Sequence, residues 1–203
     1  MIVIIDYGLG NLGSVKNTLD KLGVDSVISN SVKQIELGSG LILPGVGSAN
    51  EGMKNLKKAK LDKVIIDQIK LGKPFLGICL GMQLLFSKSE EGDVKCLDVI
   101  KGKVKKFNSK LKVPQIGWNG IKYQKSNIKN QRLFKGISEN SSFYFVNSYY
   151  CKPEDESIII GKSKYGINFP SIIRLNNIFA TQFHPEKSGL YGQQFIKNWI
   201  KQI

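Results

Sequence analysis

The sequence predicts an α/β fold in which a mostly parallel sheet is flanked by helices and extended by antiparallel strands in the C-terminal half. Two observations predict it. Short apolar runs alternate with segments of helical periodicity in the first half, and short strand-like runs without that periodicity dominate the second. At 203 residues, 41% of them hydrophobic, the chain can bury a substantial core. No repeat or linker interrupts it, so we expect one domain over residues 1–203.

In the first half, strand-like and helical segments follow one another in alternation. Apolar residues at positions 12, 15, 19 and 22 recur at the spacing that places them on one face of a helix. The expected strands are residues 2–6, 24–28, 41–43 and 75–78, and the expected helices are residues 11–22 and 53–71. This alternation favours parallel strands, because a parallel connection needs a crossover, which is usually a helix.

The second half is expected to form short strands closed by one helix. The strand candidates lie within residues 102–121 and at 143–150, 157–162, 171–175 and 178–183. Residues 189–203 follow as a helix, whose apolar positions can dock on the sheet. We therefore expect antiparallel strands added to the parallel part.

Composition and charge disfavour several classes of protein. No apolar run approaches the roughly 20 residues that a membrane helix needs, and the N-terminus lacks a basic leader, so we expect a cytoplasmic protein with no membrane partner. The net charge of +14 could indicate a nucleic-acid partner. However, only Arg132 and Arg174 are arginines, and the lysines are scattered, which is typical of a solvated surface rather than of base recognition.

The cysteines and the single histidine limit the possible chemistry. Cys79, Cys96 and Cys151 are odd in number and irregularly spaced, which argues against a disulfide framework and against a CxxC metal site. His184 is the only histidine, so a zinc site with several imidazole ligands is excluded. We expect neither a metal nor another cofactor.

Cys79 lies where an apolar strand meets a helix, within the pattern G-x-C-x-G from Gly77 to Gly81. This is the thiol counterpart of the nucleophile elbow, in which small flanking residues permit a tight turn that presents the nucleophile. A helix N-terminus also favours the thiolate. The alternative is that Cys79 is a small buried hydrophobic residue beside glycines that allow close packing. This segment alone leaves the two interpretations about equal.

The surroundings of His184 in the sequence favour the interpretation of Cys79 as a nucleophile. It precedes Pro185 directly after a strand, and Glu186 follows two positions later, so the carboxylate can orient the imidazole. Cysteine, histidine and carboxylate are the parts of an activated thiol. The glycine-rich turn at 44–48 could bind an oxyanion through its free N–H groups, together with the N–H of Leu80. An ordinary strand-ending turn is the alternative for that segment.

Alternative functions come from other features. Gly8 to Gly13 satisfies G-x-G-x-x-G after a strand, which is compatible with a dinucleotide-binding oxidoreductase. The carboxylate expected about 20 residues later is absent, since residues 29–31 are Ser, Asn and Ser. A basic nucleic-acid-binding module and a stand-alone cysteine hydrolase are further alternatives, the first favoured by the charge and the second by the elbow.

Taken together, L-P-G-V-G, G-I-C-L-G-M-Q and Q-F-H-P-E-K-S resemble the class I glutamine amidotransferases. D-Y-G-L-G-N-L-G-S-V at 6–15 and P-Q-I-G-W-N at 114–119 extend the resemblance over the whole chain, to the glutaminase subunits of imidazole glycerol phosphate synthases. The resemblance implies a flavodoxin-like fold. It also implies hydrolysis of L-glutamine through a cysteine thioester, with the ammonia passed to a separate (β/α)₈ cyclase in a heterodimer for histidine synthesis.

The resemblance also implies roles for individual residues. The catalytic residues would be Cys79, His184 and Glu186. The oxyanion would be held at Val46, Gly47 and Leu80, and glutamine would be bound by Gly45, Gln83, Ser148 and Tyr149. The residues expected to face the cyclase are Asn11, Trp118, Asn119 and Lys187.

The sequence departs from the family pattern at two positions. Relatives commonly read P-H-x-G-W-N and F-V-H-S-Y, whereas Gln115 and Asn147 stand here in place of the two histidines. Neither residue belongs to the expected triad. The departures leave the acceptor pathway open, because related glutaminases also supply ammonia for surface-sugar modification.

Overall fold

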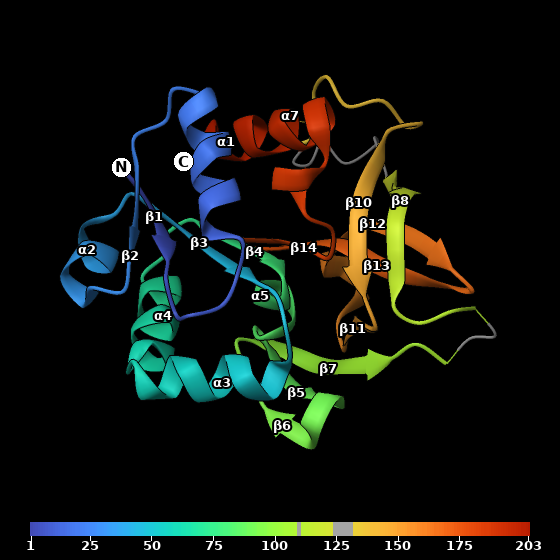
Figure 1. Ribbon diagram of the computed structural model, residues 1–203, viewed down its shortest axis with the longest axis horizontal. Helices are drawn as coiled ribbons and strands as arrows, with labels where there is room; N and C mark the ends of the chain where they lie inside the picture. The colour runs from blue at the N-terminus through green and yellow to red at the C-terminus, as the bar shows by residue number, and fades with distance from the viewer. Residues whose placement is uncertain (109–110, 124–131) are drawn as a thin grey trace.

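The fold is built around an eight-stranded sheet with helices on both faces (Figure 1). The computed structural model describes residues 1–108, 111–123 and 132–203. The strand order is β2-β1-β3-β4-β14-β13-β12-β9. Sequence neighbours are therefore not always sheet neighbours, and β4 and β14 lie side by side although about 100 residues separate them along the chain.

The parallel part of the sheet carries the central strands. It consists of β1 (Ile2–Ile5), β2 (Ser26–Ser29), β3 (Gly40–Gly45), β4 (Phe75–Cys79) and β14 (Ile178–Thr181). Every residue of β1, β3, β4 and β14 is buried. A strand buried on both faces needs apolar residues at nearly every position, which explains the continuous apolar runs of the sequence.

Helices shield the two faces of the sheet. Helices α1 (Leu12–Lys21) and α7 (Gly189–Ile200) cover one face, whereas α3 (Ala49–Lys58) and α4 (Leu61–Lys70) cover the other, and α2 (Val32–Leu37) lies beside β2 (Figure 1). Successive residues of β1 enter different cores, because side chains alternate across a strand. Val3 and Ile5 pack in the core with α3 and α4, and Ile2 and Ile4 pack in the core with α1 and α7.

Antiparallel strands extend the sheet on one side. They are β13 (Ile167–Leu175), β12 (Ile159–Tyr165) and β9 (Lys122–Tyr123). Two small sheets complete the described strands: β10 (Ser142–Asn147) with β8 (Gln115–Gly120), and β11 (Tyr149–Pro153) with β7 (Ile100–Lys106), β5 (Phe86–Ser89) and β6 (Val94–Lys95). The predicted fold class, a mostly parallel sheet with antiparallel additions, is confirmed.

Two local predictions differ from the structure, and one helix was not predicted. The helix expected over 53–71 is two helices, α3 and α4, separated at Lys60, which adopts a left-handed conformation with φ 57°. The single strand expected at 143–150 is two strands, β10 and β11, in different sheets. Helix α2 was not predicted, because six residues with one buried position, Ile35, carry too little periodicity.

The carboxyl ends of three parallel strands meet at one edge of the sheet. β3 ends at Gly45, β4 at Cys79 and β14 at Thr181, and the three strands are neighbours. Open α/β sheets bind ligands at this edge. In the part of the chain that the structure describes, no helix is long and apolar enough to cross a membrane.

Candidate active site around Cys79

Cys79 occupies a strained turn between β4 and the short helix α5 (Leu80–Gln83). Its backbone has φ 54° and ψ −106°, a conformation that residues with a side chain rarely adopt. The flanking glycines make the turn possible. A Cβ on Gly81 would collide with the carbonyl oxygen of Leu43, and a Cβ on Gly77 would lie 2.9 Å from the carbonyl oxygen of Gly81. The G-x-C-x-G segment therefore forms a tight elbow that presents the cysteine at the sheet edge.

His184 and Glu186 form a buried pair beside this elbow. Pro185 starts a single turn of 3₁₀-helix, η3 (Pro185–Lys187), which brings the side chains on either side of it together. Nδ1 of His184 lies 2.8 Å from Oε1 of Glu186, and each side chain is only 1% exposed. A carboxylate only accepts hydrogen bonds, so Nδ1 carries a proton and donates it. The carboxylate thereby fixes the orientation of the ring.

His184 and Cys79 line the same cavity. Nε2 is buried and makes no hydrogen bond to an oxygen or nitrogen of the described residues. Burial lowers the pKa of the imidazole, but negative charge on Cys79, together with the hydrogen bond to Glu186, raises that pKa to about 10. Negative charge on the sulfur therefore favours the imidazolium form of His184. The structure brings together the three side chains that the sequence singled out.

A cavity of about 390 Å³ opens over the cysteine. Its volume falls within the roughly 300–1,000 Å³ typical of small-molecule sites. Besides Cys79 and His184, it is lined by six residues predicted to hold the oxyanion or bind glutamine and by two predicted to face the partner: Val46, Gly47, Leu80, Gln83, Ser148 and Tyr149, and Asn11 and Lys187. These residues come from five separate segments of the chain, so only the fold assembles the cavity.

The turn after β3 places backbone N–H groups on the cavity wall. Gly47 has φ +94°, which favours glycine, and neither Val46 nor Gly47 donates a backbone hydrogen bond to another described residue. Leu80 is the first residue of α5, so its N–H also has no acceptor within the helix. Gly45 lies behind the wall, because a Cβ there would be 2.7 Å from Cβ of Leu80. Gly45, which was predicted to bind glutamine, thus packs against Leu80 and is not among the residues that line the cavity.

The family model and the most similar curated proteins indicate the same family. Residues 3–203 match the class-I glutamine amidotransferases. The chain is 46% identical to imidazole glycerol phosphate synthase subunit HisH 2 of Methanococcus maripaludis, covering 100% of both proteins, and 44% identical to subunit HisH of Haemophilus influenzae, covering 100% of this chain and 98% of that one. The chain belongs to the class I glutamine amidotransferase family.

The fold of this amidotransferase has relatives among solved structures. A crystal structure of a glutamine amidotransferase superposes with a TM-score of 0.77 at 16% identity, covering 99% of this chain and 98% of that one. A structure of PurLQS from Thermotoga maritima gives a TM-score of 0.74 at 14% identity, covering 99% and 97%. At this identity the likeness concerns the fold alone.

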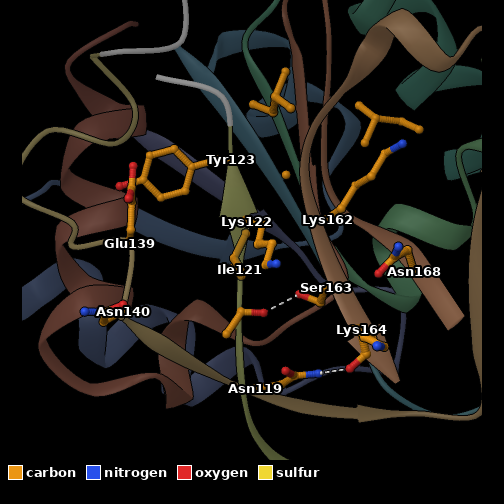
Figure 2. A pocket seen from close by; sticks show the side chains of 14 residues that line it. Asn119, Ile121, Lys122, Tyr123, Glu139, Asn140, Lys162, Ser163, Lys164 and Asn168 are labelled. Carbon is orange, nitrogen blue, oxygen red and sulfur yellow. Dashed lines mark hydrogen bonds between the residues drawn. The ribbon is translucent and has the colours of Figure 1, made fainter. Parts of the chain in front are cut away.

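Two residues predicted to face a partner lie outside the cavity of this amidotransferase. Trp118 lies on β8, is 59% exposed and makes an edge contact with Tyr144 at 6.1 Å between ring centroids. Asn119 lines a second cavity of about 630 Å³ beside β9 and β12, where its Nδ2 donates to the carbonyl oxygen of Lys164 at 2.9 Å (Figure 2). Asn119 therefore ties β8 to β12, away from Cys79.

The sequence analysis gave no role to several residues around the sulfur. Nε2 of Gln182 lies 3.7 Å from Sγ of Cys79, and the carbonyl oxygen of Val146 lies 3.9 Å from it. Glu91, Pro114 and Asn147 also line the cavity. Gln182 belongs to the quoted Q-F-H-P-E-K-S motif, which was the only signal available for it. Sequence spacing alone gives no indication that Val146 reaches the cysteine.

The other two cysteines have no comparable surroundings. Burial raises the pKa of the Cys151 thiol well above its ordinary value, and burial raises that of Cys96 to about 11. Both thiols therefore stay protonated near neutral pH. Across residues 1–108, 111–123 and 132–203, no group of three or more His, Cys, Asp or Glu side chains could hold a metal ion.

Proposed function

We propose that this chain is a glutaminase subunit of an imidazole glycerol phosphate synthase, which hydrolyses L-glutamine and supplies ammonia for histidine synthesis. The observation that carries the proposal is the Cys79 elbow facing the His184–Glu186 pair within a cavity of suitable size. The full-length relatives named HisH, at 40–46% identity, support the synthase over surface-sugar modification.

In the first step, Sγ of Cys79 attacks the side-chain carboxamide carbon of glutamine. The carbonyl electrons move to oxygen, and the N–H groups of Val46, Gly47 and Leu80, which line the cavity, would stabilise the resulting oxyanion. The imidazolium of His184 then gives its Nε2 proton to the departing nitrogen. Ammonia leaves, and a thioester remains on Cys79.

In the second step, water hydrolyses the thioester. Neutral His184 takes a proton from the attacking water, and Glu186 holds the ring in the orientation that exposes Nε2. The second tetrahedral intermediate collapses with release of glutamate and of the Cys79 thiolate. Gln83, Ser148 and Tyr149 line the cavity at positions suited to binding the amino-acid part of the substrate.

A partner is part of the proposal, since the named relatives are subunits. We assign the partner as a (β/α)₈ cyclase that docks over the outward face of β8 and β10. This face carries Ile116, which is 64% exposed, and Trp118, which is 59% exposed. Their cross-strand neighbours are Val146 and Tyr144, and Val146 also lines the Cys79 cavity. Asn11 and Lys187 on the cavity wall would lie near the ammonia exit.

The test is glutamate release by the chain alone and by the chain assembled with a cyclase subunit of a HisH-dependent synthase. We expect the wild-type complex to release glutamate and to form imidazole glycerol phosphate, and Cys79→Ser to abolish both activities. Glu186→Gln should retain part of the activity, because the base remains but loses its orienting carboxylate. Undiminished glutamate release by the Cys79→Ser complex would refute the proposal.

A further inference from the structure

A continuous chain of hydrogen bonds leads from a backbone carbonyl to the sulfur of Cys79. Nε2 of Gln83 donates to the carbonyl oxygen of Tyr149 at 3.3 Å and to Oε1 of Gln182 at 3.1 Å. Nε2 of Gln182 in turn lies 3.7 Å from Sγ of Cys79, within hydrogen-bond range for sulfur. Nδ2 of Asn147 donates to the same carbonyl oxygen of Tyr149 at 2.9 Å.

The backbone carbonyl determines the direction of every hydrogen bond in this chain. A carbonyl oxygen only accepts, so the side-chain nitrogen of Gln83 must face Tyr149. The same NH₂ group faces Gln182, which must therefore present its oxygen to Gln83. The amide of Gln182 is planar, and its NH₂ group is left to point at the sulfur. Rotating this amide by half a turn would place two NH₂ groups against each other and an oxygen against Cys79.

Burial holds this arrangement in place. Gln182 is fully buried and Gln83 is 5% exposed. The backbone of Gln182 continues β14, with its N–H bonded to the carbonyl oxygen of Ser171 at 2.9 Å. A buried amide that lost a hydrogen-bond partner would leave an unpaired polar group, which is strongly unfavourable. The donor at the sulfur is therefore fixed before any substrate arrives.

The two neighbours of the sulfur favour opposite protonation states. The carbonyl oxygen of Val146, at 3.9 Å, can accept a hydrogen bond from the neutral thiol but would repel a thiolate. The N–H group of Gln182 stabilises the thiolate, because a hydrogen bond to the charged form favours ionisation. The positively charged imidazolium of His184 also favours the thiolate. Without Gln182, Val146 would favour the unreactive thiol and only the imidazolium would oppose it.

We propose that Gln182 is a second, neutral activator of the nucleophile, donating a hydrogen bond to the Cys79 thiolate while Gln83 and the Tyr149 carbonyl hold its amide in the required orientation. The inference rests on the proposed function, in which Cys79 attacks glutamine. The same hydrogen bond stabilises the sulfur when it leaves the thioester, so Gln182 contributes to both chemical steps. Gln83 then positions the side-chain amide of Gln182, in addition to its expected contact with the substrate.

Other ionisable groups near Cys79 affect the same titration. Among the described residues, His184, Tyr7 and Cys151 interact electrostatically with the thiolate. Burial raises the pKa of both Tyr7 and Cys151, with the Cys79 charge adding to it, so both stay neutral near pH 7. Glu91 and Lys187 lie on the cavity wall. A test of Gln182 must leave all of these residues unchanged.

The experiment measures the alkylation of Cys79 by iodoacetamide between pH 5 and 10 in the full chain, with mass spectrometry resolving the three cysteines. Gln182→Leu removes the donor. Gln182→Glu keeps the shape and keeps an oxygen for Gln83, but it replaces the donor with a carboxylate oxygen. Gln68→Leu is the matched control, because Gln68 is buried on α4 and does not line the cavity.

We expect Gln182→Leu to raise the alkylation midpoint of Cys79 by about one pH unit, which corresponds to one lost hydrogen bond to a charged group. Gln182→Glu should raise it further, since the carboxylate repels the thiolate. The Cys96 profile and the Gln68→Leu variant should match wild type. In the assembled complex, kcat of Gln182→Leu should fall about tenfold at pH values below the Cys79 midpoint and approach the wild-type value above it, with KM changing less than about twofold.

Two outcomes would overturn the inference. One is a Cys79 midpoint that stays at the wild-type value in both Gln182 variants. The other is a Gln182→Glu profile that matches wild type while Gln182→Leu shifts, since that would assign Gln182 a packing role. Both outcomes are separate from a failure of the proposed function. Alkylation is measured without glutamine, whereas the proposed function fails only if the Cys79→Ser complex still releases glutamate.

Discussion

Gln115 and Asn147 are direct cross-strand partners in the antiparallel pair of β8 and β10. Both side chains are buried, at 3% and 5% exposure, and each has an oxygen without a hydrogen-bond partner among the described residues. They are also the two positions at which this sequence departs from the histidines of the family pattern. The two departures therefore meet at one place on adjacent strands, and Asn147 lines the Cys79 cavity.

This pairing predicts that the two positions are energetically coupled. Gln115→His and Asn147→His should each destabilise the chain, by about 1–3 kcal/mol, because a larger ring enters a packed site next to an unadapted neighbour. The double variant should lose about 0.5–3 kcal/mol less free energy of unfolding than the two single variants together, as expected for residues in contact. Urea unfolding of the four proteins measures the coupling. Strict additivity would show that the two side chains do not interact.

The backbone conformation of Cys79 predicts an unusual response to glycine. Its φ of 54° and ψ of −106° are strained for any residue with a Cβ, at roughly 1–3 kcal/mol. Glycine relieves that strain but loses about 0.5–1 kcal/mol through chain entropy. Cys79→Gly should therefore be about 1 kcal/mol more stable than Cys79→Ala in urea unfolding.

Cys151 provides the control for this comparison. It is buried in the regular strand β11, where nothing favours glycine, so Cys151→Ala should be more stable than Cys151→Gly. The two sites should thus rank alanine and glycine in opposite orders. The same order at both sites would mean that the elbow stores no strain.

His184 is predicted to remain protonated far above the pH at which histidine ordinarily loses its charge. With a folded-state pKa raised to about 10, against an unperturbed value near 6.5, the imidazolium persists through neutral pH and loses its proton only in the alkaline range. NMR can follow this directly, since the chain has one histidine. Wild-type imidazole signals that titrate near pH 6.5 would contradict the raised pKa of His184.

Variants separate the causes of this raised pKa. Cys79→Ala removes the largest raising influence, so burial should dominate and the pKa of His184 should fall steeply. Glu186→Gln should lower it less, because the influence of Glu186 on the imidazole ranks after that of Cys79. The same NMR titration, repeated on the two variants, gives the order of the effects.

Trp118 is predicted to contribute to partner binding and little to folding. Its side chain is 59% exposed on the outward face of β8. Trp118→Ala should weaken association with the cyclase about 30-fold, the effect of losing a typical aromatic anchor, and leave the urea midpoint nearly unchanged. Leu71→Ala is the control, since Leu71 is 78% exposed and ends α4, a helix that lies far from β8 in Figure 1. Equal affinity of both variants would place the interface elsewhere.

The sequence predicted most of the parallel sheet, because its strands are buried on both faces and therefore apolar at nearly every position. It did not predict the break at Lys60, since a lysine in the left-handed conformation has no sequence signature. Nor did it separate β10 from β11, where strand-like residues continue through Ser148 although the chain changes sheet. Pairing partners are decided by contacts far apart in sequence.

The sequence by itself predicted the class of chemistry. The G-x-C-x-G elbow and the closely spaced His184 and Glu186 predicted a reactive thiol, because residue types and short spacings are local properties of the chain. The family resemblance added glutamine as the substrate. The surroundings of the sulfur were decided only by the tertiary structure. Gln182 reaches Cys79 because β14 pairs with β4, and Val146 reaches it from another sheet. Such contacts depend on packing between distant segments, which no local pattern specifies.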